Sequence, residues 1–201
     1  MVSELILASG SRFRRSMLEA AGVYFRVIPS TVDEPTLRCQ ITEENSGVDP
    51  AQVALRLAQA KAISVSVVHP TAVVIGADQV LECRGQIFSK PVDHVDARNQ
   101  LVQLRNTTHT LPTACVLACN GQEIWSFLAR PSLTMRDVSD EYLKNYLAAV
   151  GDSVTETVGG YQLEGLGAQL FAHMQGDYFS IIGLPLLPLL AELRHLGIVP
   201  T

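Results

Sequence analysis

Short apolar runs and helically spaced apolar residues alternate along the first third of the chain. Residues 5–8 form an apolar run that stops at Ser9-Gly10, as a strand that enters a loop would. Residues 13–21 have the spacing of a helix, which Gly22 ends, and residues 23–29 predict a second strand. The polar stretch 32–49 predicts a loop with little structure of its own.

The middle of the chain continues the alternation. Asp49-Pro50 is a strong helix start, and apolar residues recur at helical spacing as far as residue 68. Residues 71–81 are β-branched and apolar enough for a buried strand, which we expect residues 76–78 to interrupt. A further helix is expected from about residue 93 to 104.

The last part of the chain adds a hairpin and two more helices. Two alternating runs within residues 107–135 flank Asn120-Gly121, a strong hairpin signal. Ser139 is placed to cap a helix that ends near Gly151, and a final helix is expected over 184–196. The pattern therefore predicts a mixed α/β fold with a twisted central sheet and flanking helices, in one domain over residues 1–201.

Composition and charge narrow the class of protein. The chain has 201 residues, 47% of them hydrophobic, and a formal net charge of −5, which argues against a protein that binds the DNA backbone. Neither a signal peptide nor an apolar segment of roughly 18 residues is visible, so we expect a cytoplasmic protein away from the membrane. The four cysteines lack metal-ligand spacing and are expected to be reduced thiols.

The loop after the first strand can bind phosphate. Ser9, Gly10 and Ser11 allow close approach to the backbone, and the helix that follows presents amide hydrogens beside Arg12, Arg14 and Arg15. The same residues also suit a capped helix with surface arginines. They form neither a Walker A loop nor a dinucleotide-binding motif.

Two acidic positions and two lysines are the other candidates. Glu34 lies in a polar loop and Asp78 lies within an apolar strand, where a carboxylate is costly unless it is paired, coordinated or used. Carboxylates from separate loops are typical of a Mg²⁺ site that also holds phosphates. Asp78 could equally be a turn residue at the end of a strand. Lys61 and Lys90 could each neutralise phosphate or be solvated surface lysines.

Together these signals form an ordered set that resembles the Maf family of nucleotide pyrophosphatases over residues 5 to about 196. The motifs that carry the resemblance are Leu-Ala-Ser-Gly-Ser (7–11) with Arg14-Arg15, Val-Asp-Glu (32–34), Leu-Ala-x-x-Lys-Ala (57–62), Gly-Ala-Asp-Gln-Val (76–80), Lys-Pro (90–91), Gly-Gly-Tyr-x-x-Glu-Gly-x-Gly (159–167) and Gly-Leu-Pro-Leu (183–186). The resemblance implies a fold related to inosine triphosphate pyrophosphatases, with a cleft between two lobes. It also implies a divalent metal (Mg²⁺ or Mn²⁺), a homodimer, and cleavage of a nucleoside triphosphate into monophosphate and pyrophosphate.

The resemblance assigns roles by position. Ser9 and Arg14 would line the phosphate end of the site, and Asp78 would accept the proton of the attacking water. Glu34 would bind the metal with Asp78. Lys61 and Lys90 would complete the polar cluster around the phosphates.

The same resemblance indicates the substrate. Phe13, Gln79 and Glu164 stand where the pyrimidine-directed branch has other residues, and they resemble the branch that acts on 7-methyl-GTP. An aromatic face and a carboxylate suit the cationic methylated guanine. Arg12, Ser89 and the Gly160-Tyr161 pair depart from this pattern, so a dTTP or UTP pyrophosphatase is the alternative. An inosine-type pyrophosphatase and a nucleotide-binding regulator of septum formation are further alternatives.

Overall fold

The computed structural model describes residues 4–44 and 47–200, which divide into two compact units. The first unit contains residues up to 79, residues 112–129 and residues from 177 onward. The second unit contains residues 80–111 and 130–176. Each unit has its own five-stranded sheet. The mixed α/β class is therefore confirmed, with the strands shared between two sheets.

The sheet of the first unit combines parallel and antiparallel strands. In pairing order its strands are β2 (Arg26–Val27), β1 (Leu5–Leu7), β3 (Val73–Gln79), β7 (Thr113–Cys119) and β8 (Gln122–Ala129). β1 runs parallel to β2 and β3, whereas β7 runs antiparallel to β3 and β8. The hairpin predicted at Asn120-Gly121 joins β7 to β8, and both residues have the positive φ that a tight hairpin turn requires.

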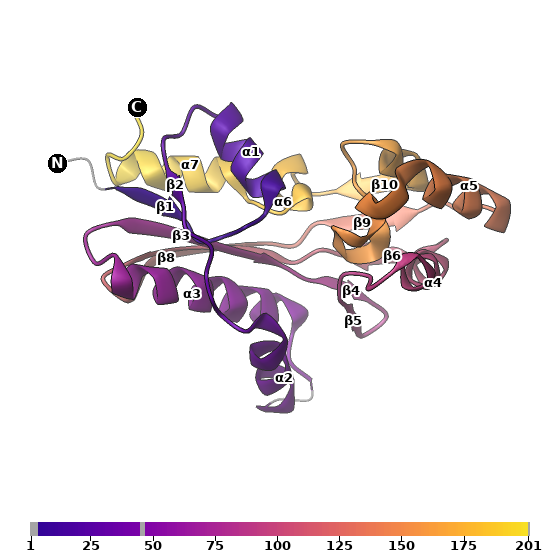
Figure 1. The fold of residues 1–201 in the computed structure, drawn as a ribbon, viewed down its shortest axis with the longest axis horizontal. Coiled ribbons are helices and arrows are strands. Elements are labelled where there is room, and N and C mark those ends of the chain that lie inside the picture. The colour runs from indigo at the N-terminus through magenta and orange to yellow at the C-terminus, as the bar shows by residue number, and fades with distance from the viewer. Residues whose placement is uncertain (1–3, 45–46, 201) are drawn as a thin grey trace. The chain divides into compact units, whose positions relative to one another are not determined.

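Helices cover both faces of this sheet (Figure 1). They are α1 (Arg12–Ala20), α3 (Pro50–Val68), α6 (Tyr178–Ile182) and α7 (Leu186–His195), while α2 (Glu34–Glu44) packs against α3. Leu7 and Ile75 pack with α1 and α7 in one apolar cluster, while Ile6 and Val74 pack with Val65 of α3 in another. Successive residues of a strand point to opposite faces, so each strand contributes to both layers.

One expectation for the N-terminal region was wrong, and another was correct only in part. The stretch 32–49 was expected to be a loop, but residues 34–44 form α2; residues 45–46 lie outside the described residues. Asp33 caps this helix by accepting hydrogen bonds from the amide and hydroxyl of Thr36, which hold the pKa of Asp33 below its ordinary value. Only Ile41 of α2 is buried, which explains why the sequence lacks an apolar helical pattern.

The second expected strand, over residues 23–29, shortens to two residues. The amide of Val23 donates to the carbonyl of Leu18, so the start of that stretch completes the end of α1. The cap signals elsewhere were correct: Asp49, Asp93 and Ser139 each cap the helix that follows through their side chains.

The second unit is built around an antiparallel sheet. In pairing order its strands are β10 (Phe171–Gln175), β9 (Ser132–Met135), β6 (Thr108–Thr110), β4 (Leu81–Cys83) and β5 (Gln86–Phe88). Its helices are α4 (His94–Leu104) and α5 (Asp140–Val150), followed by the short turns η1 (Gly151–Thr155), η2 (Val158–Gly160) and η3 (Leu166–Leu170). The region 107–135 thus holds four strands where two were expected.

The glycine-rich stretch of the second unit is fixed by buried hydrogen bonds. The hydroxyl of Tyr161 lies 2.7 Å from Nε2 of His109, and the hydroxyl of Tyr146 donates to the carbonyl of Gly160 at 3.1 Å. Burial lowers the pKa of His109 to about 4, so the imidazole is neutral at physiological pH. In the described part of the chain, no helix is long and apolar enough to cross a membrane.

Candidate active site

The C-terminal end of β3 places two polar side chains on opposite faces of the sheet. Val74 packs toward α3, whereas Ile75 and Ala77 pack toward α1 and α7. The two-residue period therefore directs Asp78 toward α3 and Gln79 toward α1 and α6. The expected interruption at residues 76–78 is wrong, because all three residues pair with β7 in an unbroken ladder.

Gly76 allows α3 to approach this strand closely. A Cβ atom at Gly76 would lie 2.2 Å from the carbonyl oxygen of Ala58 and 2.8 Å from the Cβ of Ala62. No side chain fits in that space, so the helix and strand backbones meet directly. This contact sets Lys61, the residue before Ala62, beside the end of β3.

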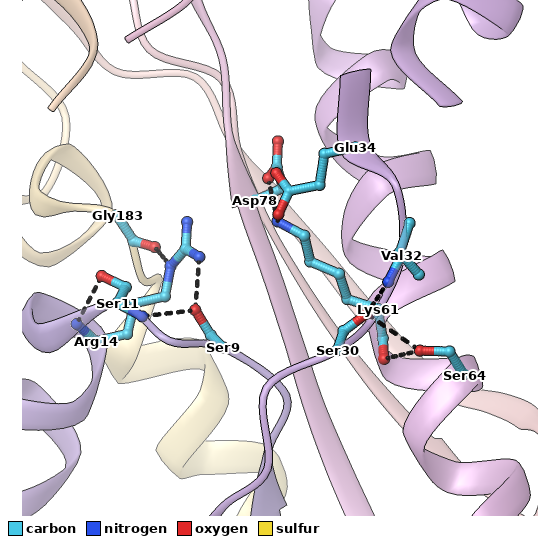
Figure 2. A network of polar contacts seen from close by, with 10 residues as sticks. All are labelled: Ser9, Ser11, Arg14, Ser30, Val32, Glu34, Lys61, Ser64, Asp78 and Gly183. Atoms are coloured by element: carbon cyan, nitrogen blue, oxygen red, sulfur yellow. Dashed lines mark hydrogen bonds and ion pairs between the residues drawn. The ribbon is translucent and has the colours of Figure 1, made fainter. Parts of the chain in front are cut away.

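Lys61 bridges the two acidic candidates. Its Nζ donates to Oδ1 of Asp78 at 2.7 Å and pairs with Oε1 of Glu34 at 2.9 Å (Figure 2). The side chains of Lys61 and Asp78 are only 7% and 6% exposed, whereas that of Glu34, at the first residue of α2, is 45% exposed. Lys61 is therefore a buried cation, and the surface interpretation of this lysine is wrong.

Asp78 is electrostatically unusual. Burial raises the pKa of its carboxyl group, and the positive charges of Lys61 and Arg14 only partly oppose that effect. Its Oδ2 atom is buried and has no hydrogen-bond partner among the described residues. A buried carboxylate oxygen without a partner is costly, which is typical of a group that awaits a ligand or takes part in a reaction.

Arg14 and Ser9 meet at the start of α1. Nη1 of Arg14 donates to Oγ of Ser9 at 3.0 Å, and Nε donates to the carbonyl of Gly183 at 2.8 Å (Figure 2). Ser11 caps the helix through the amide of Arg14. The Nη2 group has no hydrogen bond to any residue that the structure describes, so it can donate to a phosphate oxygen beside the N-terminus of the helix.

Gln79 is held by its amide nitrogen on the other face of the sheet. Its Nε2 donates to Oγ1 of Thr113 at 2.8 Å and to the carbonyls of Ser180 and Ile181, each at 3.0 Å. The donors of the amide are thus engaged within the protein, and Oε1 is the atom left to accept a hydrogen bond from a ligand.

Phe13 precedes Arg14 in α1 and is half-buried. The guanidinium of Arg12 lies over its ring, 4.8 Å from the centroid. The ring is thus already in contact with one cation, and the role of Phe13 in base recognition stays a prediction.

Lys90 and Glu164 belong to the second unit and are exposed. No hydrogen bond or ion pair joins either side chain to the rest of the described chain. The place of Lys90 in the polar cluster and the role of Glu164 in base recognition stay predictions. The structure brings together Ser9 with Arg14, and Glu34 with Lys61 and Asp78, within the first unit.

The donor set of this cluster fits a hard divalent cation. Lys61 occupies Oδ1 of Asp78 and Oε1 of Glu34, which leaves one oxygen on each carboxylate. Mg²⁺ is commonly held by one or two carboxylates together with substrate phosphates and water. Among the described residues no group of three or more His, Cys, Asp or Glu side chains could hold a metal ion by itself. A cation at this site would therefore depend on the substrate for further ligands.

Comparison with known proteins identifies the family of the chain. The family model described as Maf-like protein matches residues 4–196. The chain belongs to the Maf-like protein family. A relative from Mesorhizobium japonicum, named 7-methyl-GTP pyrophosphatase, is 46% identical over 99% of both chains. A relative from Paramagnetospirillum magneticum, named nucleoside triphosphate pyrophosphatase, is 47% identical over 96% of this chain and 98% of its own.

Among solved structures, a nucleoside-triphosphatase described as a dITP/XTP pyrophosphatase from Mycobacterium abscessus aligns over 98% of both chains. It is 14% identical, with a TM-score of 0.42, which is too low to establish a shared fold by itself.

Replacing Gly76 should lower the stability of the protein. We expect Gly76→Ala to lower the free energy of unfolding by about 2–4 kcal/mol, because the new methyl group would overlap the backbone of α3. Chemical denaturation measures this loss. Gly10→Ala is the matched control, since nothing lies within 4 Å of a Cβ at Gly10. Equal stability of the two variants would contradict the close approach of α3 and β3.

Proposed function

We propose that this protein hydrolyses the α–β phosphoanhydride of a nucleoside triphosphate, and that 7-methyl-GTP is its preferred substrate. The observation that carries the proposal is the buried Asp78 carboxylate, which has one oxygen on Lys61 and the other without a partner. The names of the relatives from Mesorhizobium and Paramagnetospirillum support the same reaction class.

In the proposed reaction Asp78 acts as the general base. Its Oδ2 atom takes a proton from a water molecule. The water oxygen forms a bond to the α-phosphorus as the bond between that phosphorus and the α–β bridging oxygen breaks. The bond electrons leave with pyrophosphate, and the other product is the nucleoside monophosphate. Burial raises the pKa of Asp78, which makes it a stronger base than an ordinary aspartate, while the positive charge of Lys61 favours the ionised form.

Positive charge balances the phosphates. Arg14 is anchored through two of its nitrogens, which leaves Nη2 oriented for a phosphate oxygen without further loss of side-chain freedom. Because Oδ2 of Asp78 takes the proton in this proposal, the cation that the resemblance places on Glu34 and Asp78 would rest mainly on the second carboxylate oxygen of Glu34. Such an ion supplies charge neutralisation on the phosphate oxygens. Lys90 would add a further cation at the phosphates.

Base recognition is the finer part of the proposal. Gln79 offers an acceptor oxygen, which suits an N–H group on the edge of guanine. Phe13 and Glu164 would favour the positive charge of the methylated ring, through the aromatic face and the carboxylate respectively.

A nucleotide panel tests the proposal. The purified protein is incubated with Mg²⁺ or Mn²⁺ and with 7-methyl-GTP, GTP, dTTP, UTP or ITP, and pyrophosphate and monophosphate are quantified by chromatography. We expect kcat/KM for 7-methyl-GTP to exceed that for GTP by about tenfold, the ratio that roughly 1.4 kcal/mol of cation recognition gives. Glu164→Gln should reduce this ratio, and EDTA should abolish turnover.

The other outcomes separate the alternatives. Preference for dTTP or UTP would keep the mechanism and replace the substrate, and preference for ITP would indicate an inosine-type enzyme. Release of orthophosphate in place of pyrophosphate would contradict cleavage at the α–β bond. Absence of turnover with every nucleotide would favour a nucleotide-binding regulator. The homodimer and the cytoplasmic location stay predictions.

A further inference from the structure

Two serines outside every motif of the active site connect Glu34 to the helix that carries Lys61. Ser30 lies in the loop between β2 and α2, and Ser64 lies one turn after Lys61 in α3. Their hydroxyl oxygens are 3.2 Å apart, and both side chains are half-buried (Figure 2).

The neighbouring hydrogen bonds fix the direction of this contact. The single hydroxyl hydrogen of Ser64 is donated to the carbonyl of Lys61 at 3.0 Å. Ser64 can therefore only accept from Ser30, so Ser30 is the donor between the two. Ser30 in turn accepts a hydrogen bond from the amide of Val32 at 3.1 Å. Each hydroxyl thus donates once and accepts once, in a chain from Val32 to Lys61.

This chain closes a ring with the ion pair of the active site. The carbonyl of Lys61 holds the loop before α2 through the two serines, while the Nζ of Lys61 holds Glu34, two residues after Val32. The backbone carbonyl and the side-chain nitrogen of Lys61 are thus both connected to the short segment from Ser30 to Glu34. Burial adds little to hold this segment, since Ile41 is the one buried residue of α2 and the side chain of Glu34 is 45% exposed.

We propose that Ser30 and Ser64 are positioning residues that hold the start of α2 against α3 and thereby place the Glu34 carboxylate beside Asp78. This inference rests on the proposed function, in which Glu34 acts at the metal and phosphates. In this proposal the serines act through Glu34 and have no direct role at the substrate.

Ser64→Ala is the variant that tests the proposal. Alanine is the best helix former, so the change removes the hydroxyl without weakening α3. We expect kcat/KM to fall about fivefold to tenfold, and Ser64→Thr, which keeps a hydroxyl, to restore most of it. Ser66→Ala is the matched control, because Ser66 makes the same kind of bond to the carbonyl of Ile63 but receives the amide of Gly121 in the hairpin.

A double-mutant cycle separates positioning from a general structural effect. In the background of Glu34→Gln, Ser64→Ala should have less than a twofold effect on kcat/KM, because the residue through which it acts has lost its charge. If Ser64→Ala lowered kcat/KM as strongly in the Glu34→Gln background as in the wild type, the proposal would be overturned.

Hydrogen–deuterium exchange gives a readout that is independent of activity. Ser64→Ala and Ser30→Ala should each accelerate exchange in the peptide that contains Val32 by about tenfold, whereas Ser66→Ala should not. Unchanged exchange at Val32 would overturn the proposal. If Glu34→Gln by itself left turnover unchanged, the proposed role of Glu34 in the reaction would fail. The exchange measurement would still decide whether Ser30 and Ser64 hold the start of α2 against α3.

Discussion

Asp78→Asn should lower kcat by a factor of about 10²–10⁴, the usual contribution of a general base. Asparagine has nearly the same shape as aspartate, and its Oδ1 can still accept the hydrogen bond from Nζ of Lys61. The variant loses the oxygen that would take the proton, because its amide nitrogen cannot act as a base. The rate is measured under saturating 7-methyl-GTP by the release of pyrophosphate.

The folded state of this variant should survive. Burial already disfavours the charged form of Asp78. The substitution therefore removes the cost of burying a charge together with a favourable contact with Lys61, and the two effects oppose each other. We expect Tm to change by less than about 5 °C. Asp137→Asn, at an exposed position, is the control for the chemistry of the substitution. Wild-type turnover in Asp78→Asn would remove Asp78 from the role of base.

The second large effect is expected for Lys61→Met. Methionine matches the length of the buried stem but carries no charge, so Asp78 loses its nearest cation and Glu34 loses its partner. We expect kcat/KM at neutral pH to fall about 10²-fold or more. Lys144→Met, an exposed lysine of α5, is the control and should leave turnover unchanged.

The pH dependence of Lys61→Met distinguishes an electrostatic effect from misfolding. The charge of Lys61 lowers the pKa of Asp78, so its removal must raise that pKa further. A base acts only when it is ionised, and the acid limb of the kcat/KM profile should therefore move to higher pH. Activity that is equally low at every pH would show that Lys61 does more than keep Asp78 ionised.

The sequence predicted most of the helices because their ends carry strong local signals. Asp49 with Pro50, Asp93 and Ser139 each marked the start of a helix that the structure contains. The helix α2 was missed because it buries only Ile41, and a helix that contributes so little to a core has no apolar periodicity to detect.

The packing around Asp78 was beyond the reach of the sequence. Gly76 was interpreted as a break in a strand, which is the usual meaning of glycine in an apolar run. Its actual role depends on the backbone of Ala58 and Ala62, and no local pattern connects these positions. Ser30 and Ser64 escaped notice for a similar reason, because serine is common and their contact joins residues 34 positions apart. The motifs identified Asp78 and Lys61, whereas only the structure revealed that both are buried and paired.

The two-residue period of β3 has a consequence for how this protein can evolve. Asp78 and Gln79 are neighbours in sequence, yet they belong to opposite faces of the sheet and to different sets of contacts. If Gln79 recognises the base as proposed, substitutions at Thr113 or in α6 can alter which base is accepted without removing the contact between Asp78 and Lys61. Under the proposed roles, the contacts of Gln79 can therefore change in evolution while the pair of Asp78 and Lys61 on the opposite face of the same strand is retained.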